Sequence, residues 1–153
     1  MAMNLLPLLP QLEPKAIAWA ESLQAHAFRV GQALSVQDLE LARSIGVMRP
    51  ERIRVAEVTS LSLPGDDDLR AAATQTGLMS DQTIGMTFGY GIFIRQGELC
   101  TRLLSHEFRH VYQYEQAGSI ATFISEYMLQ IMSFGYARAP LEIDAFDHQV
   151  DHA

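Results

Sequence analysis

The chain has a single cysteine, few basic residues and no long apolar run, and each of these shortages excludes a class of protein. Cys100 stands alone and cannot close an intrachain disulfide, so a disulfide-stapled secreted scaffold is excluded. The 11 Lys and Arg residues are outnumbered by 18 Asp and Glu residues. Phosphate binding requires clustered Lys and Arg, so this balance argues against nucleic acid as the main partner.

The apolar N-terminal stretch, residues 1–10, is not typical of a targeting or membrane segment. It lacks a basic region, and Pro7 and Pro10 interrupt it. It is also far shorter than the roughly 20 apolar residues that a membrane span requires. We therefore expect a docking arm or a frayed end here, a cytoplasmic protein and no membrane partner.

What the chain does have is enough apolar residues for one core. Of its 153 residues 48% are hydrophobic, and no linker, repeat or low-complexity tract divides it. We expect a single domain, in which an N-terminal helical segment over residues 1–48 covers a core formed by residues 50–153. In the first segment the pattern predicts helices over 16–34 and 38–45, the second one capped by Ser35.

The rest of the chain mixes two strand-like segments with helices. Alternating apolar and polar residues predict strands over 52–58 and 83–95. Gly85, Gly89 and Gly91 interrupt the second strand, which indicates bulges or the close approach of another backbone. Helical patterns and caps predict further helices, which lie between the acidic run at 66–68 and Gly77, and over about 99–116, 119–134 and 141–150. The sequence thus predicts an α+β fold, mainly helical around a small β-sheet.

The candidate metal-binding and catalytic residues lie in one pentapeptide, His106-Glu107-Phe108-Arg109-His110. It reads H-E-x-x-H and falls within a predicted helix. Residues four apart share a helix face, so both imidazoles can bind one Zn²⁺ ion at about 2.0–2.1 Å. Glu107 follows the first ligand directly, and its carboxylate can take a proton from a zinc-bound water as a general base.

Other classes of metal site fit the pentapeptide less well. A di-iron carboxylate site would use Glu107 and His110 as one half, but it needs a second Glu-x-x-His, which the sequence does not have. The extended motif of metzincins places Gly at 113 and His at 116, where this chain has Gln113 and Gln116. The remaining alternative is a helix with surface histidines and no metal. Zinc is the favoured interpretation.

A catalytic zinc needs a third protein ligand, which must come from a later element. Glu142 is the preferred candidate because it stands at the start of the last predicted helix. A helical hairpin between the two can fold that helix back on the helix that contains His106 and His110. Glu126 lies on the polar face of the 119–134 helix and can equally be solvated. The spacing leaves three further candidates open, namely Asp144, Asp147 and His148.

Three stretches together resemble the gluzincin metallopeptidases in their minimal, single-domain form. They are GIFIR at 91–95, LLSHEFRHVYQY at 103–114 and PLEIDA at 140–145. In that family a strand precedes the active-site helix, and a later glutamate helix gives the third ligand, often with Ala three residues on, as in Glu142 and Ala145. The resemblance covers roughly residues 84–148.

The chain departs from this family at one position. Thermolysin-like members usually carry Asp or a small polar residue four positions after the third ligand, where this chain has Phe146. Asp144 and Asp147 are the candidate substitutes for that supporting residue.

The resemblance implies a zincin-like fold and zinc-dependent hydrolysis of a peptide or protein substrate. His106, His110 and Glu142 would bind the zinc ion, and Glu107 would be the general base. The strand residues Ile92, Phe93 and Ile94 would present an edge to which an extended substrate pairs, unless the N-terminal arm fills it. The oxyanion donor would be a tyrosine, and the candidates are Tyr90, Tyr112, Tyr114 and Tyr136. The oligomeric state stays open.

A second function is compatible with the same residues: a zinc-containing domain without turnover that serves as a binding or regulatory module. The presence of Glu107 favours activity. Outside the motif, Cys100 is expected to be a buried small hydrophobe. Within the motif, Arg109 is expected to be a salt-bridge partner that points away from the zinc. Three histidines are expected at the surface, namely His26, His148 and His152.

Overall fold

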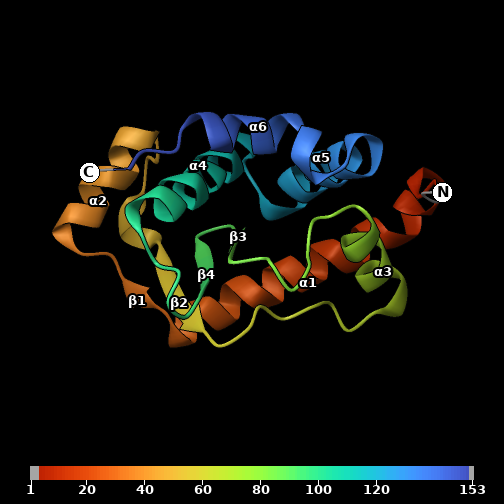
Figure 1. Ribbon diagram of the computed structural model, residues 1–153, viewed down its shortest axis with the longest axis horizontal. Helices are drawn as coiled ribbons and strands as arrows, with labels where there is room; N and C mark the ends of the chain where they lie inside the picture. Colours follow the sequence, from red (N-terminus) through yellow and green to blue (C-terminus); the bar gives the residue numbers. More distant parts are fainter. Residues whose placement is uncertain (1–3, 152–153) are drawn as a thin grey trace.

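A mixed four-stranded sheet with the strand order β1-β2-β4-β3 lies among six α-helices in the computed structural model, which describes residues 4–151 (Figure 1). The strands are β1 (Gln32–Ala33), β2 (Arg54–Val58), β3 (Gly85–Phe88) and β4 (Gly91–Arg95). The helices are α1 (Leu9–Val30), α2 (Val36–Ile45), α3 (Asp67–Gln75), α4 (Thr101–Ala117), α5 (Ile120–Phe134) and α6 (Pro140–Asp147). Short 3-10 turns cover Leu6–Leu8, Pro50–Arg52 and Tyr136–Arg138. The predicted α+β class is confirmed.

The N-terminal helix begins earlier than predicted. Helix α1 starts at Leu9, because Pro10 is favourable in a first turn, where its missing N–H would lack a partner anyway. Leu5 and Leu12 are buried in the core, so the expectation of a frayed end is wrong from residue 5 onward. Residues 1–3 lie outside the described part of the chain. Helix α2 follows the prediction, since the Ser35 hydroxyl accepts the Asp38 N–H at 3.1 Å.

The second predicted strand is a hairpin of two strands. Strands β3 and β4 pair antiparallel, and the chain reverses at Gly89, whose φ of +63° lies in the left-handed region. Strand β4 also pairs in parallel with β2, so it lies inside the sheet. The expectation that residues 92–94 form an exposed edge is therefore wrong. An unbroken apolar run of this kind is typical of a strand that is buried on both faces.

The two faces of the sheet are covered by different helices. Ile92 and Ile94 pack into a cluster with apolar residues of α2 and α4, whereas Phe93 packs with residues of α1, α3 and α5. Figure 1 shows the strands between α1 on one side and α4 on the other. Residues of α1 and α2 thus belong to the core together with those of the strands and of α4 and α5.

The C-terminal half forms a helical hairpin and a returning helix. Helix α4 ends at Gly118, with φ +92°, and the Ser119 hydroxyl caps α5 by accepting the Thr122 N–H at 3.0 Å. Helix α6 then folds back along α4, where Arg109 Nε donates to Asp144 Oδ2 at 2.8 Å. This confirms Arg109 as a salt-bridge partner. No helix in residues 4–151 is long and apolar enough to cross a membrane.

Cys100 has a different position from the one predicted. It is exposed and precedes α4, where its Sγ accepts the Leu103 N–H at 3.5 Å as an N-cap. Its sequence context, which suggested a buried small hydrophobe, gave no sign of this cap. The sulfur occupies the place that Ser or Asp takes in most helices.

Candidate metal centre

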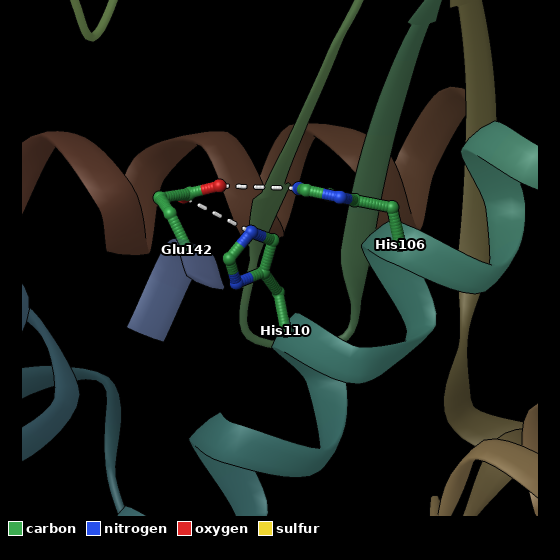
Figure 2. Close-up of side chains that lie close together, drawn as sticks. All are labelled: His106, His110 and Glu142. Carbon is green, nitrogen blue, oxygen red and sulfur yellow. Dashed lines mark hydrogen bonds and ion pairs between the residues drawn. The ribbon is translucent and has the colours of Figure 1, made fainter. Parts of the chain in front are cut away.

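Helix α4 places two histidines on its buried face. His106 and His110 are one turn apart, and both are almost fully buried. Their Nε2 atoms point to the same side, toward the start of α6 (Figure 2). The helical context that the pentapeptide requires is therefore present.

Glu142 comes to this point from α6. Its side chain is 2% exposed, with Oε1 at 3.1 Å from His106 Nε2 and Oε2 at 3.1 Å from His110 Nε2 (Figure 2). One ligand atom from each of the three residues lies within 4.8 Å of the others, which is close enough to bind one metal ion.

The other candidates for the third ligand lie elsewhere. Glu126 and Asp147 are exposed, Asp144 accepts from Arg109, and His148 contacts Asp144. His26 is exposed as expected, whereas His148 is only partly so. His152 lies outside the described residues.

Two glutamines fix the orientation of the histidine rings. His106 Nδ1 lies 2.8 Å from Gln149 Oε1, and His110 Nδ1 lies 2.8 Å from Gln113 Oε1. Because an amide oxygen only accepts, each Nδ1 carries the proton. Each Nε2 faces a Glu142 oxygen, which also only accepts, so a metal ion that binds there takes the place of a proton on Nε2.

The orientation of the Gln113 amide is itself determined. Its Nε2 donates at 2.9 Å both to the Leu141 carbonyl and to Asp144 Oδ2, and both of these partners can only accept. The amide oxygen must therefore face His110. Asp144, a predicted substitute for the missing supporting residue, acts on the histidine only through Gln113.

Tyr127 of α5 also contacts the metal centre. Its hydroxyl donates to Glu142 Oε2 at 2.5 Å, in a buried position. The sequence pattern does not predict this role, because Tyr127 falls on the apolar stripe of α5. A signal was present nonetheless: a tyrosine at a buried position usually needs a hydrogen-bond partner for its hydroxyl.

The buried charges stabilise one another. Burial alone would raise the pKa of Glu142, but His110 and hydrogen bonds from both histidines and Tyr127 hold it well below its usual range. Burial would likewise lower the pKa of His110, but the Glu142 carboxylate raises it to about 9. Glu142 is therefore ionised, as a metal ligand must be.

Glu107 lies beside the three residues. It is 3% exposed, and its Oε1 accepts the Thr87 hydroxyl of β3 at 2.8 Å. Gly85 of the same strand faces it, since a Cβ at that position would be in van der Waals contact with the Glu107 carboxyl carbon, at 3.4 Å. The pocket that contains the triad also contains Glu107.

That pocket has a volume of about 310 Å³, and apolar side chains line most of it. Of the four candidate oxyanion donors, Tyr114 and Tyr136 line it, while Tyr90 and Tyr112 do not. The Tyr114 hydroxyl donates to the Thr87 carbonyl at 3.1 Å. The Tyr90 hydroxyl donates to Glu115 at 2.8 Å, and burial together with this carboxylate raises the pKa of Tyr90 to about 12.

The predicted substrate strand does not border the pocket. Ile92, Phe93 and Ile94 are buried inside the sheet and are absent from the pocket lining. Strand β3, by contrast, is at the sheet edge, and all of its residues, from Gly85 to Phe88, line the pocket. An extended chain that paired with this sheet near the triad would meet β3 instead.

Comparison with protein-family models, with curated proteins and with solved structures finds no match. The resemblance to gluzincins therefore depends on the H-E-x-x-H segment, on Glu142 and Ala145, and on the strand before the helix. The geometry of these residues carries the functional argument.

Proposed function

We propose that the protein is a zinc-dependent metallopeptidase that binds zinc through His106, His110 and Glu142. The observation that carries this proposal is the convergence of the three buried side chains with Glu107 beside them in one pocket. The gluzincin-like order of these residues along the chain supports it further.

The donor set fits zinc. Two imidazole nitrogens and one carboxylate are the ligands of a common class of catalytic zinc sites, which keep a fourth position open. Ligands about 2.0–2.1 Å from a tetrahedral ion lie about 3.3 Å from one another. The three residues meet this requirement only loosely as they stand, since one ligand atom from each lies within 4.8 Å of the others.

The roles of the residues follow from their positions. Zinc, when bound, supplies Lewis acidity that activates water and polarises a carbonyl. Glu107 takes a proton from the attacking water and passes it to the leaving amine. It is buried and lies in the same pocket as the three ligands. Tyr127 orients Glu142, and Gln113 and Gln149 orient the histidines. Tyr136 is our preferred oxyanion donor, because it lines the pocket beside Glu142 of the metal centre, whereas the Tyr114 hydroxyl donates to the Thr87 carbonyl.

Metal content tests the first part of the proposal. The purified protein is expected to contain about one zinc ion per chain, and His106→Ala is expected to lose it. His26→Ala is the matched control, because His26 is exposed on α1. Full zinc content in His106→Ala would contradict the proposed ligand set.

Cleavage of a broad peptide library by the zinc-loaded protein tests the second part. Glu107→Gln keeps an oxygen that can accept the Thr87 hydroxyl but removes the base, so it should keep zinc and lose turnover roughly 10²–10⁴-fold. Unchanged turnover would remove Glu107 from the mechanism. If the wild type, with zinc confirmed, cleaves nothing, the peptidase proposal is wrong and the alternative of a zinc-containing binding module is favoured.

A further inference from the structure

Residues 149–151, which follow α6 without regular secondary structure, run along the first half of α4 (Figure 1). Their contacts are with Arg102, Ser105 and His106, which are three or four positions apart and therefore share one face of the helix. We call residues 149–151 the clasp. It lies beyond residue 148, where the resemblance to gluzincins ends.

Ser105 fixes the middle of the clasp. Its side chain is fully buried, and its hydroxyl donates to the Arg102 carbonyl at 2.9 Å. Since a hydroxyl has one proton, its oxygen can then only accept, and it accepts the Val150 N–H at 3.0 Å. This bond holds the backbone directly beside Gln149.

Gln149 is the residue of the clasp that reaches the metal centre. Its Oε1 accepts His106 Nδ1 at 2.8 Å, and the Phe146 ring packs edge-on against the His106 ring, with the centroids 4.6 Å apart. Rotation of the His106 ring away from Glu142 would break the contact with Gln149. Phe146 stands where thermolysin-like proteins carry a supporting polar residue, so in this chain the support comes from the clasp instead.

The supports of the two histidines differ in how firmly they are held. Gln113 lies on α4 itself, three residues from His110, whereas the clasp is an irregular segment. Its last two residues are exposed, and the ion pair between Asp151 and Arg102 is exposed on both sides, so it contributes little. A segment with few buried contacts opens locally at far less than the cost of global unfolding. The support of His106 can therefore be released while α4 stays folded.

We propose that the clasp positions His106 for the metal ion, and that its opening sets how fast a bound ion leaves. The inference rests on the metal site of the proposed function and does not depend on peptide cleavage. Coupling of this kind is reciprocal: if the closed clasp raises metal affinity, bound metal stabilises the closed clasp by the same factor. Both effects can be measured without turnover.

Zinc affinity and the rate of zinc release to excess chelator measure the first effect. Gln149→Leu removes the acceptor and should lower zinc affinity 10–100-fold. Most of this change should be faster release, because an unsupported His106 rotates off the ion more readily. Gln149→Glu restores an acceptor and should keep the affinity at or above the wild-type level. Because Leu fills similar space, a difference between the two variants identifies the hydrogen bond as the cause.

Ser105→Ala tests the clasp at a residue whose side chain contacts no metal ligand. It removes the anchor of Val150 and should speed zinc release about two- to tenfold. Ser22→Ala is the matched control, because the exposed Ser22 hydroxyl also donates to the carbonyl three residues before it, but on α1. Should Ser105→Ala fail to fold by circular dichroism, the two Gln149 variants still decide the question.

Amide hydrogen exchange at Val150 measures the reciprocal effect. Its N–H is bonded to Ser105 Oγ, so its exchange reports the opening of the clasp. Saturating zinc should slow this exchange tenfold or more in the wild type and far less in Gln149→Leu.

The outcomes separate this inference from the proposed function. Equal zinc affinity and release in Gln149→Leu and the wild type, or exchange at Val150 that zinc does not change, would overturn the inference and leave the ligand set in place. A wild-type protein that binds no zinc would overturn both. Zinc affinity that depends on the clasp, in a protein that cleaves no peptide, would support the inference and reject only the peptidase function.

Discussion

At the scale of single residues, the two metal-binding histidines are oriented by neutral amides. Gln149 accepts from His106 and Gln113 accepts from His110. An amide orients an imidazole without adding a charge of its own beside the metal centre. The carboxylate of Asp144 does not contact a histidine ring directly: it accepts from Gln113 and is paired with Arg109.

Removing one of these amides should weaken metal binding. Gln113→Leu keeps approximate size but leaves His110 Nδ1 without its acceptor, while Asp144 loses one donor and keeps Arg109. Loss of such a supporting residue typically costs 10–100-fold in metal affinity. Competition with a chelator of known zinc affinity measures this change.

Gln116→Leu is the matched control, because Gln116 is exposed on the same helix. It should leave zinc affinity unchanged within about twofold, since surface substitutions usually act weakly. Equal zinc affinity in Gln113→Leu and the wild type would show that His110 needs no such support.

At the scale of elements, the β3–β4 hairpin positions both Thr87 and the rim of the pocket, and it depends on Gly89. This residue has φ +63°, and a Cβ there would lie 2.2 Å from the side-chain oxygen of Gln24. That oxygen accepts the Tyr90 N–H at 3.0 Å, so the hairpin turn is fastened to α1.

A non-glycine residue in the left-handed conformation costs about 1–2 kcal/mol. Gly89→Ala should lower the free energy of unfolding by more than this, because the new Cβ also displaces the Gln24 side chain. Gly97→Ala is the control: it has φ +87°, and a Cβ there meets nothing within 4 Å. Urea unfolding of both variants should give a larger loss of unfolding free energy for Gly89→Ala. Equal losses would show that Gln24 moves aside without cost.

The sequence predicts local features of these elements better than their pairing. Ser35 and Ser119 identify helix starts correctly, because a cap is a contact between residues three apart. The sequence predicts one strand where the structure has a hairpin, because the apolar alternation continues across Gly89. The interior position of β4 depends on its pairing with β2, which lies more than 30 residues earlier in the chain, and no local pattern records it.

The same limit applies to the candidate site. The sequence predicts three of the site residues, His106, Glu107 and His110, because they lie within five positions of one helix. The position of Glu142 beside the histidines depends on how α6 packs against α4, which the sequence does not specify. Its hydrogen-bond partner Tyr127 lies on a third helix, α5. Gln149 follows α6 in an irregular segment, where spacing alone carries no information about contacts.

At the scale of the whole molecule, the metal centre brings together α4 and α6, which α5 separates along the chain. His106 and His110 lie on α4 and Glu142 on α6, with the Arg109–Asp144 pair as a second link between the same helices. Since the three ligands meet only in the folded chain, an ion bound there should stabilise the native state over the unfolded state.

Zinc at 100 times its dissociation constant should raise the unfolding free energy by about 2.7 kcal/mol. For a domain of this length that corresponds to an increase of roughly 5–10 °C in Tm. Thermal unfolding followed by circular dichroism, with and without a chelator, measures the increment. Glu142→Gln keeps an acceptor for Tyr127 but removes the charged ligand, so most of the increment should disappear.

Glu126→Gln makes the same chemical change on the exposed face of α5. It should keep the full zinc-dependent increment, because Glu126 is exposed and is not among the residues whose ligand atoms converge. Comparing increments within each variant, with and without metal, separates ligand loss from any change that the substitution makes to the metal-free protein. An increment that survives in Glu142→Gln and disappears in Glu126→Gln would assign the third ligand to α5, and it would contradict the arrangement of α4 and α6 described above.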